Sequence, residues 1–391
     1  MLDKTIEIAE ELIAIPGCAE LPEKETKVAE KLCAILRSGG VETELIHAAS
    51  DRLNLLAVHR GTGGGRSLLL CTHLDTVPAY EMVDAFAPAV RDGRLYGRGA
   101  VDVKDILAAM AVVMLRLARE KTKLAGDVLF LAVADEESGS MGMRHAVRDP
   151  RVIGADFAII GEPSGLDIGI AHKGVAWFEA VFHGKATHGG SPEKGVNAVY
   201  HAMHFVNLLT NEMIPELDNR IDPLLGRATM NVGVVRGGTR PTIVPDTCTV
   251  QWDRRILPAE NYAGVSSEYL ALLERLKAED PQVKYDFSAL LGNEKRPFPP
   301  LSTLPDDPCV QRTVRAAHTV LGREPRLAGL SFWTDAALFS ATCGKPAVVF
   351  GPGSIEQAHS NNEYVPLCEL EKAVCFYYDM AAAFCGREGG Q

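Results

Sequence analysis

Strand-length apolar runs alternate with helical stripes of apolar residues through the N-terminal part of this chain. The runs that read as strands cover residues 53–58, 67–71, 128–134 and 156–161. They are short and almost continuously apolar, which is typical of strands buried on both faces of a sheet. Between them, Ile106, Met110, Val113 and Leu117 recur at the spacing of one helix face. This alternation predicts an α/β fold, with a mixed, largely parallel sheet and helices on both faces.

A different pattern interrupts the α/β alternation in the middle of the chain. Its strands and helices are expected at residues 175–182, 197–209, 230–235, 247–254 and 259–278. They suit a compact α+β unit of two layers. A proline-rich linker follows from about Asn293, and α/β character then returns. We therefore predict a discontinuous domain formed by residues 1–174 and 290–391, with a second domain inserted at residues 175–289.

The composition limits the classes of protein that fit. A length of 391 residues favours two domains over a single core. A net charge of −11 and a pI of about 5.5 argue against nucleic-acid binding and against binding to an anionic membrane. Nine scattered cysteines without a C-x-x-C pair indicate a reducing compartment. The N-terminus carries acids within its apolar pattern and no apolar run could span a bilayer, so we expect a cytoplasmic location.

Polar side chains follow two of the predicted strands at the point where each strand ends. His73 and Asp75 follow the run at 67–71, and the run at 128–134 leads into Asp135-Glu136-Glu137. Ligands of open α/β sheets bind outside the carboxyl ends of the strands. A histidine with an aspartate two residues later suggests a metal ligand and the carboxylate that orients it. Adjacent glutamates on an extended segment point to opposite sides, which suggests two different tasks.

Three further polar residues occupy comparable places in the sequence. Asp102 follows a glycine-containing turn, Glu162 follows the run at 156–161, and His359 comes after the apolar segment 348–350. Each residue alone has an ordinary explanation, such as a helix N-cap, a solvated loop or a structural histidine. Five such groups at one predicted sheet edge are better explained by a shared site.

The donor set suits a pair of divalent metal ions. Two histidines and four carboxylates fit zinc, with cobalt or manganese as alternatives. One carboxylate is expected to bridge the two ions, and another should stay unligated as a proton carrier. No single spacing here is as diagnostic as H-E-x-x-H, so the assignment depends on the whole set.

These motifs together resemble the M20 metallopeptidase family, which includes acetylornithine deacetylases, succinyl-diaminopimelate desuccinylases, aminoacylases and glutamate carboxypeptidases. The matching segments are His73-Leu74-Asp75-Thr76-Val77-Pro78, Gly97-Arg98-Gly99-Ala100-Val101-Asp102, Asp135-Glu136-Glu137-Ser138-Gly139-Ser140, Gly161-Glu162-Pro163-Ser164 and Ala358-His359-Ser360-Asn361-Asn362-Glu363. The resemblance covers nearly the whole chain, the inserted domain included.

The resemblance implies a role for each of these residues. The implied metal ligands form two sets: His73, Asp102 and Glu162 for one ion, and Asp102, Glu137 and His359 for the other. Asp102 would therefore be the bridging carboxylate. Asp75 would accompany the first metal histidine as a catalytic residue, and Glu136 would be the general base.

The inserted domain resembles the family's lid and dimerisation domain. His188 falls on the histidine that reaches the active site of the partner subunit, which implies a homodimer. The implied substrate-binding residues are Asn231, Arg255 and Gly353. Arg255 suits bidentate binding of a substrate carboxylate, with an ordinary surface strand arginine as the alternative. Thr242 stands where the family often carries asparagine, so substrate contacts there depart from the family pattern, and Arg240 is placed to compensate.

The implied activity is hydrolysis of an amide bond by a metal-activated water. The expected substrate is a small N-acyl amino acid that is held by its carboxylate. A carboxypeptidase or dipeptidase with the same site is the alternative within enzymes. A non-catalytic binding protein of the same fold would require the loss of a ligand or of the base, and the motifs contain all of them.

Overall fold

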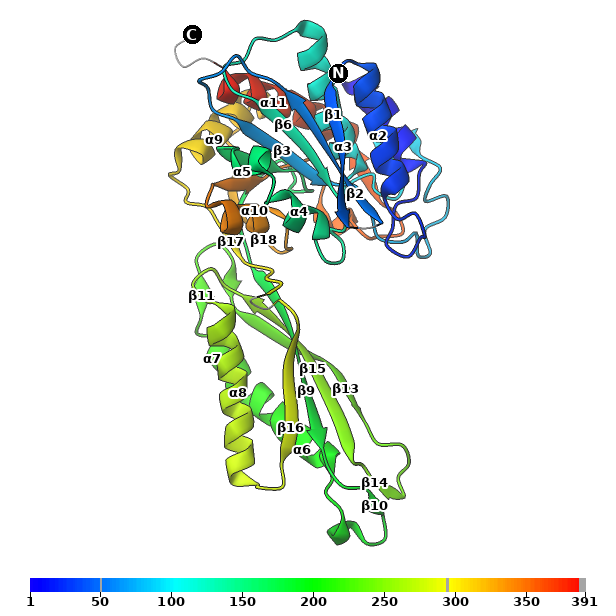
Figure 1. Cartoon of the computed structure of the whole chain (residues 1–391), viewed down its shortest axis with the longest axis vertical. Helices are drawn as coiled ribbons and strands as arrows, with labels where there is room; N and C mark the ends of the chain where they lie inside the picture. Colours follow the sequence, from blue (N-terminus) through cyan, green and yellow to red (C-terminus); the bar gives the residue numbers. More distant parts are fainter. Residues whose placement is uncertain (50, 293–294, 387–391) are drawn as a thin grey trace. The chain divides into compact units, whose positions relative to one another are not determined.

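The computed structural model describes residues 1–49, 51–292 and 295–386, which form two units (Figure 1). The first unit comprises Met1–Ile170, Thr303–Ala328 and the chain from Thr334, and the second comprises Ala171–Ser302 and Gly329–Trp333. The second unit therefore interrupts the first in sequence. The linker that was expected to begin at Asn293 starts outside the described residues. In the described ranges, no helix is long and apolar enough to cross a bilayer.

A mixed sheet forms the centre of the first unit. Its strands, in spatial order, are β1 (Glu42–Ala49), β2 (Arg52–His59), β6 (Val128–Val133), β3 (Leu68–His73), β7 (Phe157–Ile160), β19 (Ala347–Val349), β8 (Ile168–His172) and β17 (Leu301–Ser302), with β18 (Leu327–Leu330) paired to β8. The four strands from β6 to β19 are parallel, and the outer strands are antiparallel. Strands β3, β6 and β7 are completely buried, as their continuous apolar sequences predict.

Helices cover both faces of this sheet, which confirms the predicted fold class (Figure 1). One layer contains α1 (Leu2–Ile13), α2 (Thr26–Ser38), α3 (Lys104–Glu120), α9 (Pro308–Leu321) and α11 (Leu367–Cys385), and the other contains α4 (Met141–Ala146), α5 (Pro150–Ile153) and α10 (Ala336–Cys343). The predicted stripe of Ile106, Met110, Val113 and Leu117 on α3 is fully buried in the core. A smaller sheet, ordered β20-β5-β4, joins Tyr364–Pro366, Arg94–Tyr96 and Ala89–Arg91.

The register of the parallel strands brings their carboxyl ends to one edge of the sheet. His73 at the end of β3 lies opposite Val133 at the end of β6. Ile160 of β7 lies opposite Cys71 of β3 and opposite Val349 of β19. The segments that leave these four strands therefore start side by side, which is the arrangement that places a ligand site in open α/β sheets.

The second unit is a four-stranded antiparallel sheet with helices on one face. Its strand order is β13 (Thr229–Gly237), β15 (Thr247–Ile256), β9 (Gly174–His183) and β16 (Lys284–Leu291). Its main helices are α6 (Ala198–Leu208) and α8 (Tyr262–Glu279). Shorter elements are β10 (Thr187–His188), β11 (Ile221–Asp222), β12 (Gly226–Arg227), β14 (Ile243–Val244) and α7 (Ile214–Leu217). Phe178 and Trp252 stack in a buried aromatic cluster beneath the helices. The sequence prediction missed β16 of this unit and, among the sheets of the first unit, β4, β5, β8, β17, β18 and β20.

Candidate metal centre

Two histidines face the same aspartate from opposite sides at the carboxyl edge of the main sheet. His73 Nε2 lies 3.0 Å from Asp102 Oδ1 and 3.7 Å from Glu162 Oε1. His359 Nε2 lies 3.2 Å from Asp102 Oδ2 and 3.1 Å from Glu137 Oε1. Asp102 thus presents one carboxylate oxygen to each of two groups of donors. The structure places the five expected ligands, which come from five separate segments, in one cluster.

The spacing of the donor atoms fits divalent metal ions. Ligand atoms held tetrahedrally at about 2.0–2.1 Å from one zinc ion lie roughly 3.3 Å from each other. The histidine-to-carboxylate distances of 3.0–3.7 Å bracket this value. Within the described ranges, His73, Asp102 and Glu137 are the one group of three such side chains whose donor atoms all lie within 4.8 Å of each other. The residues around Asp102 therefore suit the binding of divalent metal.

Asp75 orients both the first histidine and the glutamate pair. Asp75 offers two acceptors to Nδ1 of His73: its carbonyl oxygen at 2.9 Å and its Oδ1 at 3.6 Å. This arrangement turns Nε2 toward Asp102. The Asp75 carboxylate also accepts hydrogen bonds from the backbone N–H groups of Glu136 and Glu137, each at 3.1 Å. One buried carboxylate therefore fixes the segment that carries the expected base and one expected ligand.

The charges in this cluster favour bound cations. Burial alone would raise the pKa of Asp102, but hydrogen bonds from His359 and His73 hold that pKa well below its usual range. The hydrogen bonds that His359 makes with Asp102 and Glu137 raise the pKa of His359 to about 10. Burial raises the pKa of both Glu136 and Glu162 well above the usual range. Carboxylates outnumber imidazoles here, and divalent cations would compensate the excess negative charge.

Gly353 occupies a position that strongly favours glycine. Its φ of 75° lies in the left-handed region, and a Cβ atom there would come within 2.2 Å of Val101 Cγ2. Its N–H donates to Glu369 Oε2 at 2.8 Å. The glycine therefore allows its loop to pass close beside the segment that carries Asp102.

The remaining expected site residues belong to the second unit. His188 is exposed at the end of β10, and its Nδ1 accepts a hydrogen bond from the Gly190 N–H at 3.0 Å. The imidazole proton must then reside on Nε2, which can donate to a substrate. Asn231 lies opposite Asp253 in the sheet, and Arg255 Nε donates to Asp253 Oδ2 at 2.9 Å. Asn231 and Arg255 therefore share the sheet face that the helices leave uncovered.

Sequence reasoning missed the residues that support the expected ligands. Arg52 pairs with Asp135 at 2.8 Å and with Glu25 at 2.9 Å, which ties the segment before Glu136 to the start of β2. All three side chains are buried. The only signal in the sequence was the presence of charged residues beside an apolar strand. The sequence alone could not show which of them pair, because the partners come from distant segments.

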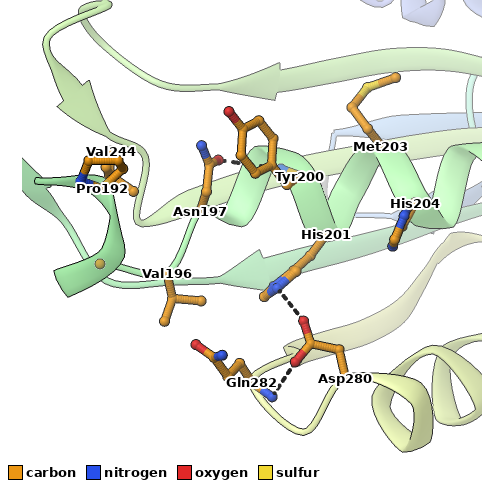
Figure 2. A pocket seen from close by; sticks show the side chains of 11 residues that line it. Pro192, Val196, Asn197, Tyr200, His201, Met203, His204, Val244, Asp280 and Gln282 are labelled. Atoms are coloured by element: carbon orange, nitrogen blue, oxygen red, sulfur yellow. Dashed lines mark hydrogen bonds and ion pairs between the residues drawn. The ribbon is translucent and has the colours of Figure 1, made fainter. Parts of the chain in front are cut away.

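A pocket of about 580 Å³ lies in the second unit (Figure 2). It is lined by side chains of α6 and of the segments around Val196 and Asp280. His201 Nε2 lies 3.2 Å from Asp280 Oδ2 there. The pocket contains one histidine–carboxylate pair, so the converging side chains at the sheet edge of the first unit form the stronger candidate site.

Comparison with known proteins shows the family and the fold that this chain resembles. The model of peptidase family M20/M25/M40 matches residues 69–383. An acetylornithine deacetylase of Myxococcus xanthus is 31% identical over 364 residues, which cover 90% of each chain. An M20 family metallo-carboxypeptidase of Sulfolobus solfataricus has the same fold, with a TM-score of 0.80, 20% identity and coverage of 98% and 99% of the two chains. A dinuclear metal binding peptidase of this family from Bacillus subtilis has a TM-score of 0.74, 18% identity and 98% coverage of both chains.

Proposed function

Because this chain belongs to the M20/M25/M40 peptidase family and is thus a metal-dependent amide hydrolase, we propose that it removes the acyl group from a small N-acyl amino acid. The observation that carries this proposal is the placement of Asp102 between His73 and His359, with one oxygen toward each. A deacetylase activity is favoured because the acetylornithine deacetylase of Myxococcus xanthus is similar over nearly the full length of both chains.

Five side chains would hold the two ions. The proposed ligands are His73, Asp102 and Glu162 for one ion, and Asp102, Glu137 and His359 for the other. Zinc fits this set of imidazole and carboxylate donors, with cobalt or manganese as alternatives. When bound, such a pair supplies Lewis acidity that polarises the scissile carbonyl and lowers the pKa of the attacking water.

Glu136 is the proposed proton carrier. Its neighbour Glu137 faces His359 at 3.1 Å, whereas no ion pair joins Glu136 to a histidine among the described contacts. Asp75 fixes the backbone of both glutamates, which lie in a turn and not on the extended segment that was expected. The proposed division of tasks therefore rests on the contact of Glu137 with His359. Glu136 would take the proton of the attacking water and pass it to the leaving nitrogen.

The proposed lid is the inserted domain at residues 175–289, which makes up most of the second unit. It would supply contacts to the substrate. The Nε2–H of His188 would stabilise the oxyanion of the tetrahedral intermediate. Arg255 would bind the substrate carboxylate through its Nη groups, since Asp253 accepts from its Nε. Asn231 and Gly353 would complete the substrate site. A reducing compartment such as the cytoplasm suits the nine free cysteines.

A substrate panel tests the proposed activity. N-acetyl and N-succinyl amino acids, with N-acetylornithine among them, would be compared with dipeptides in the presence of zinc, cobalt or manganese. We expect kcat/KM to be highest for an N-acyl amino acid, because the site is proposed to hold one carboxylate and one short acyl group. Faster release of amino acids from dipeptides would instead assign a dipeptidase or carboxypeptidase.

We also propose that two copies pair through α6 and β13 of the second unit. β13 is an edge strand of its sheet and carries the half-exposed Val235. Tyr200 and Met203 on α6 are 71% and 48% exposed, and both project away from Asp280 (Figure 2). An unpaired edge strand beside exposed apolar side chains favours association, and a twofold dimer is the commonest closed form.

His188→Ala should lower turnover by about 10²–10³-fold, the usual cost of an oxyanion donor. Metal content should stay unchanged because His188 is not a proposed ligand. If His188 acts across the dimer, mixing this variant with Glu136→Gln subunits should restore activity above that of either parent. One site of the mixed dimer would then receive both intact residues.

Steady-state turnover of the mixed sample, with subunit exchange verified by differently tagged chains, measures this complementation. His183→Ala is a matched control, since His183 is another partly exposed histidine of the same unit and pairs with Asp286. It should turn over substrate at the wild-type rate. Proven mixed dimers without recovered activity would show that His188 does not act in the partner's site.

A further inference from the structure

A buried ion pair between Arg98 and Glu363 belongs to the same unit as the candidate metal centre. The two side chains are 1% and 0% exposed, and Arg98 Nη1 lies 2.5 Å from Glu363 Oε2. Neither residue is a proposed ligand or proton carrier. A buried ion pair persists only when further hydrogen bonds compensate its desolvation, so the other partners of the pair indicate what it holds in place.

Glu363 binds the turn that ends at the bridging aspartate. Its Oε1 accepts hydrogen bonds from the backbone N–H groups of Gly99, Val101 and Asp102, at 2.9, 3.0 and 3.2 Å. Three donors on one oxygen fix the backbone from which the Asp102 side chain projects. Glu363 also follows His359 by only four residues. One carboxylate therefore connects the segments of two expected ligands.

Arg98 extends the same connection to a third segment. Its Nε donates to the carbonyl oxygen of Pro78 at 3.1 Å. Pro78 ends the segment that begins at His73. The ion pair thus contacts the three chain segments that carry His73, Asp102 and His359, which lie far apart in the sequence.

We propose that Arg98 and Glu363 are positioning residues that hold the Asp102 carboxylate between His73 and His359, and so set the affinity of the metal pair. This inference rests on the proposed metal-dependent function. The two Nε2-to-oxygen distances at Asp102, 3.0 and 3.2 Å, require all three segments to keep their places. Loss of a partner that orients metal ligands typically weakens metal binding by about 10–100-fold.

Two substitutions test this role in the full-length protein. Glu363→Gln keeps an oxygen for the three amides but removes the charge opposite Arg98. Arg98→Lys keeps that positive charge but loses the planar fork that joins Glu363 to Pro78. Metal-free protein would be titrated with zinc in competition with a chromophoric chelator. We expect at least one of two equivalents to bind about 10–100-fold more weakly in each variant.

Thr303→Val provides the matched control. Thr303 is a buried residue of the same unit, and its Oγ1 donates to the Ala347 carbonyl at 2.6 Å. Its loss should lower the unfolding temperature of the metal-free protein but leave both zinc affinities unchanged. The variants of the ion pair should lose affinity beyond this control.

Wild-type zinc affinity in folded Glu363→Gln would overturn the inference. If Glu363→Gln does not fold, the zinc titration of Arg98→Lys tests the inference, because that variant retains the buried positive charge. Unchanged zinc affinity in Arg98→Lys would also overturn the inference. A wild-type chain that binds no divalent ion would overturn both this inference and the proposed function. Two tight equivalents in the wild type with weakened binding in the variants would support both.

Discussion

Asp102→Ala should remove both divalent ions at once. One oxygen of Asp102 faces His73 and the other faces His359, so each proposed metal loses an anionic ligand in this variant. The remaining donors are one histidine and one glutamate for each ion, fewer than the three protein ligands of typical catalytic zinc sites. Elemental analysis after gel filtration should find less than one equivalent per chain, and hydrolysis should fall to background.

Asp307→Ala is the control for this experiment. Asp307 caps α9 of the same unit by accepting a hydrogen bond from the Cys309 N–H at 2.7 Å. Loss of such a cap costs about 1 kcal/mol of stability, but no proposed ligand is affected. The control should therefore retain two equivalents of metal and full turnover. Two tightly bound ions in Asp102→Ala would rule out its bridging role.

The strand ends of the candidate site could be predicted because they depend on local sequence. The continuous apolar runs of β3, β6 and β7 identified buried strands, and the polar residue after each run identified the edge. Parallel pairing then places His73, Glu137 and Glu162 near each other without further information. The register of a parallel sheet is what converts these separate motifs into one site.

Asp102 and His359 were expected at the same sheet edge, but neither directly follows a strand of the parallel sheet. Asp102 follows β5 of the small sheet, and His359 has a φ of 59° in a long connection after β19. Their positions depend on the pairing of β20 with β5 and on the contacts of Glu363. These contacts join segments more than 250 residues apart, and periodicity carries no information about them. Local patterns included both residues in the shared site, and the family resemblance added their expected roles as ligands.

The sequence predicted that the second unit has a different architecture, but it did not predict all of its strands. Alternation along β9, β13 and β15 indicated a half-buried sheet, and these strands are present. β16 was missed although Tyr285, Phe287 and Ala289 alternate with exposed residues. Its proximity to the proline-rich segment obscured the pattern, and its assignment as a strand depends on pairing with β9.

Glu136→Gln should lower turnover by about 10²–10⁴-fold while both metals stay bound. The amide keeps the size of the side chain but cannot accept the proton of the attacking water, and this range is typical for loss of a general base. The loss of turnover should appear in kcat at saturating substrate, in stopped and continuous assays alike. The reason is that Glu136 is assigned to proton transfer and not to substrate binding. Near-normal turnover would exclude this role.

The adjacent Glu137 supplies the control. Its Oε1 lies 3.1 Å from His359, so Glu137→Gln should weaken one metal equivalent as well as turnover. Asp75 holds both backbone N–H groups at 3.1 Å, so neither substitution removes the support of the segment. Metal analysis of the two variants therefore separates the tasks of neighbouring glutamates. Loss of metal in Glu136→Gln with retention in Glu137→Gln would reverse the two assignments, because the ligand must be the glutamate whose neutralisation releases the ion.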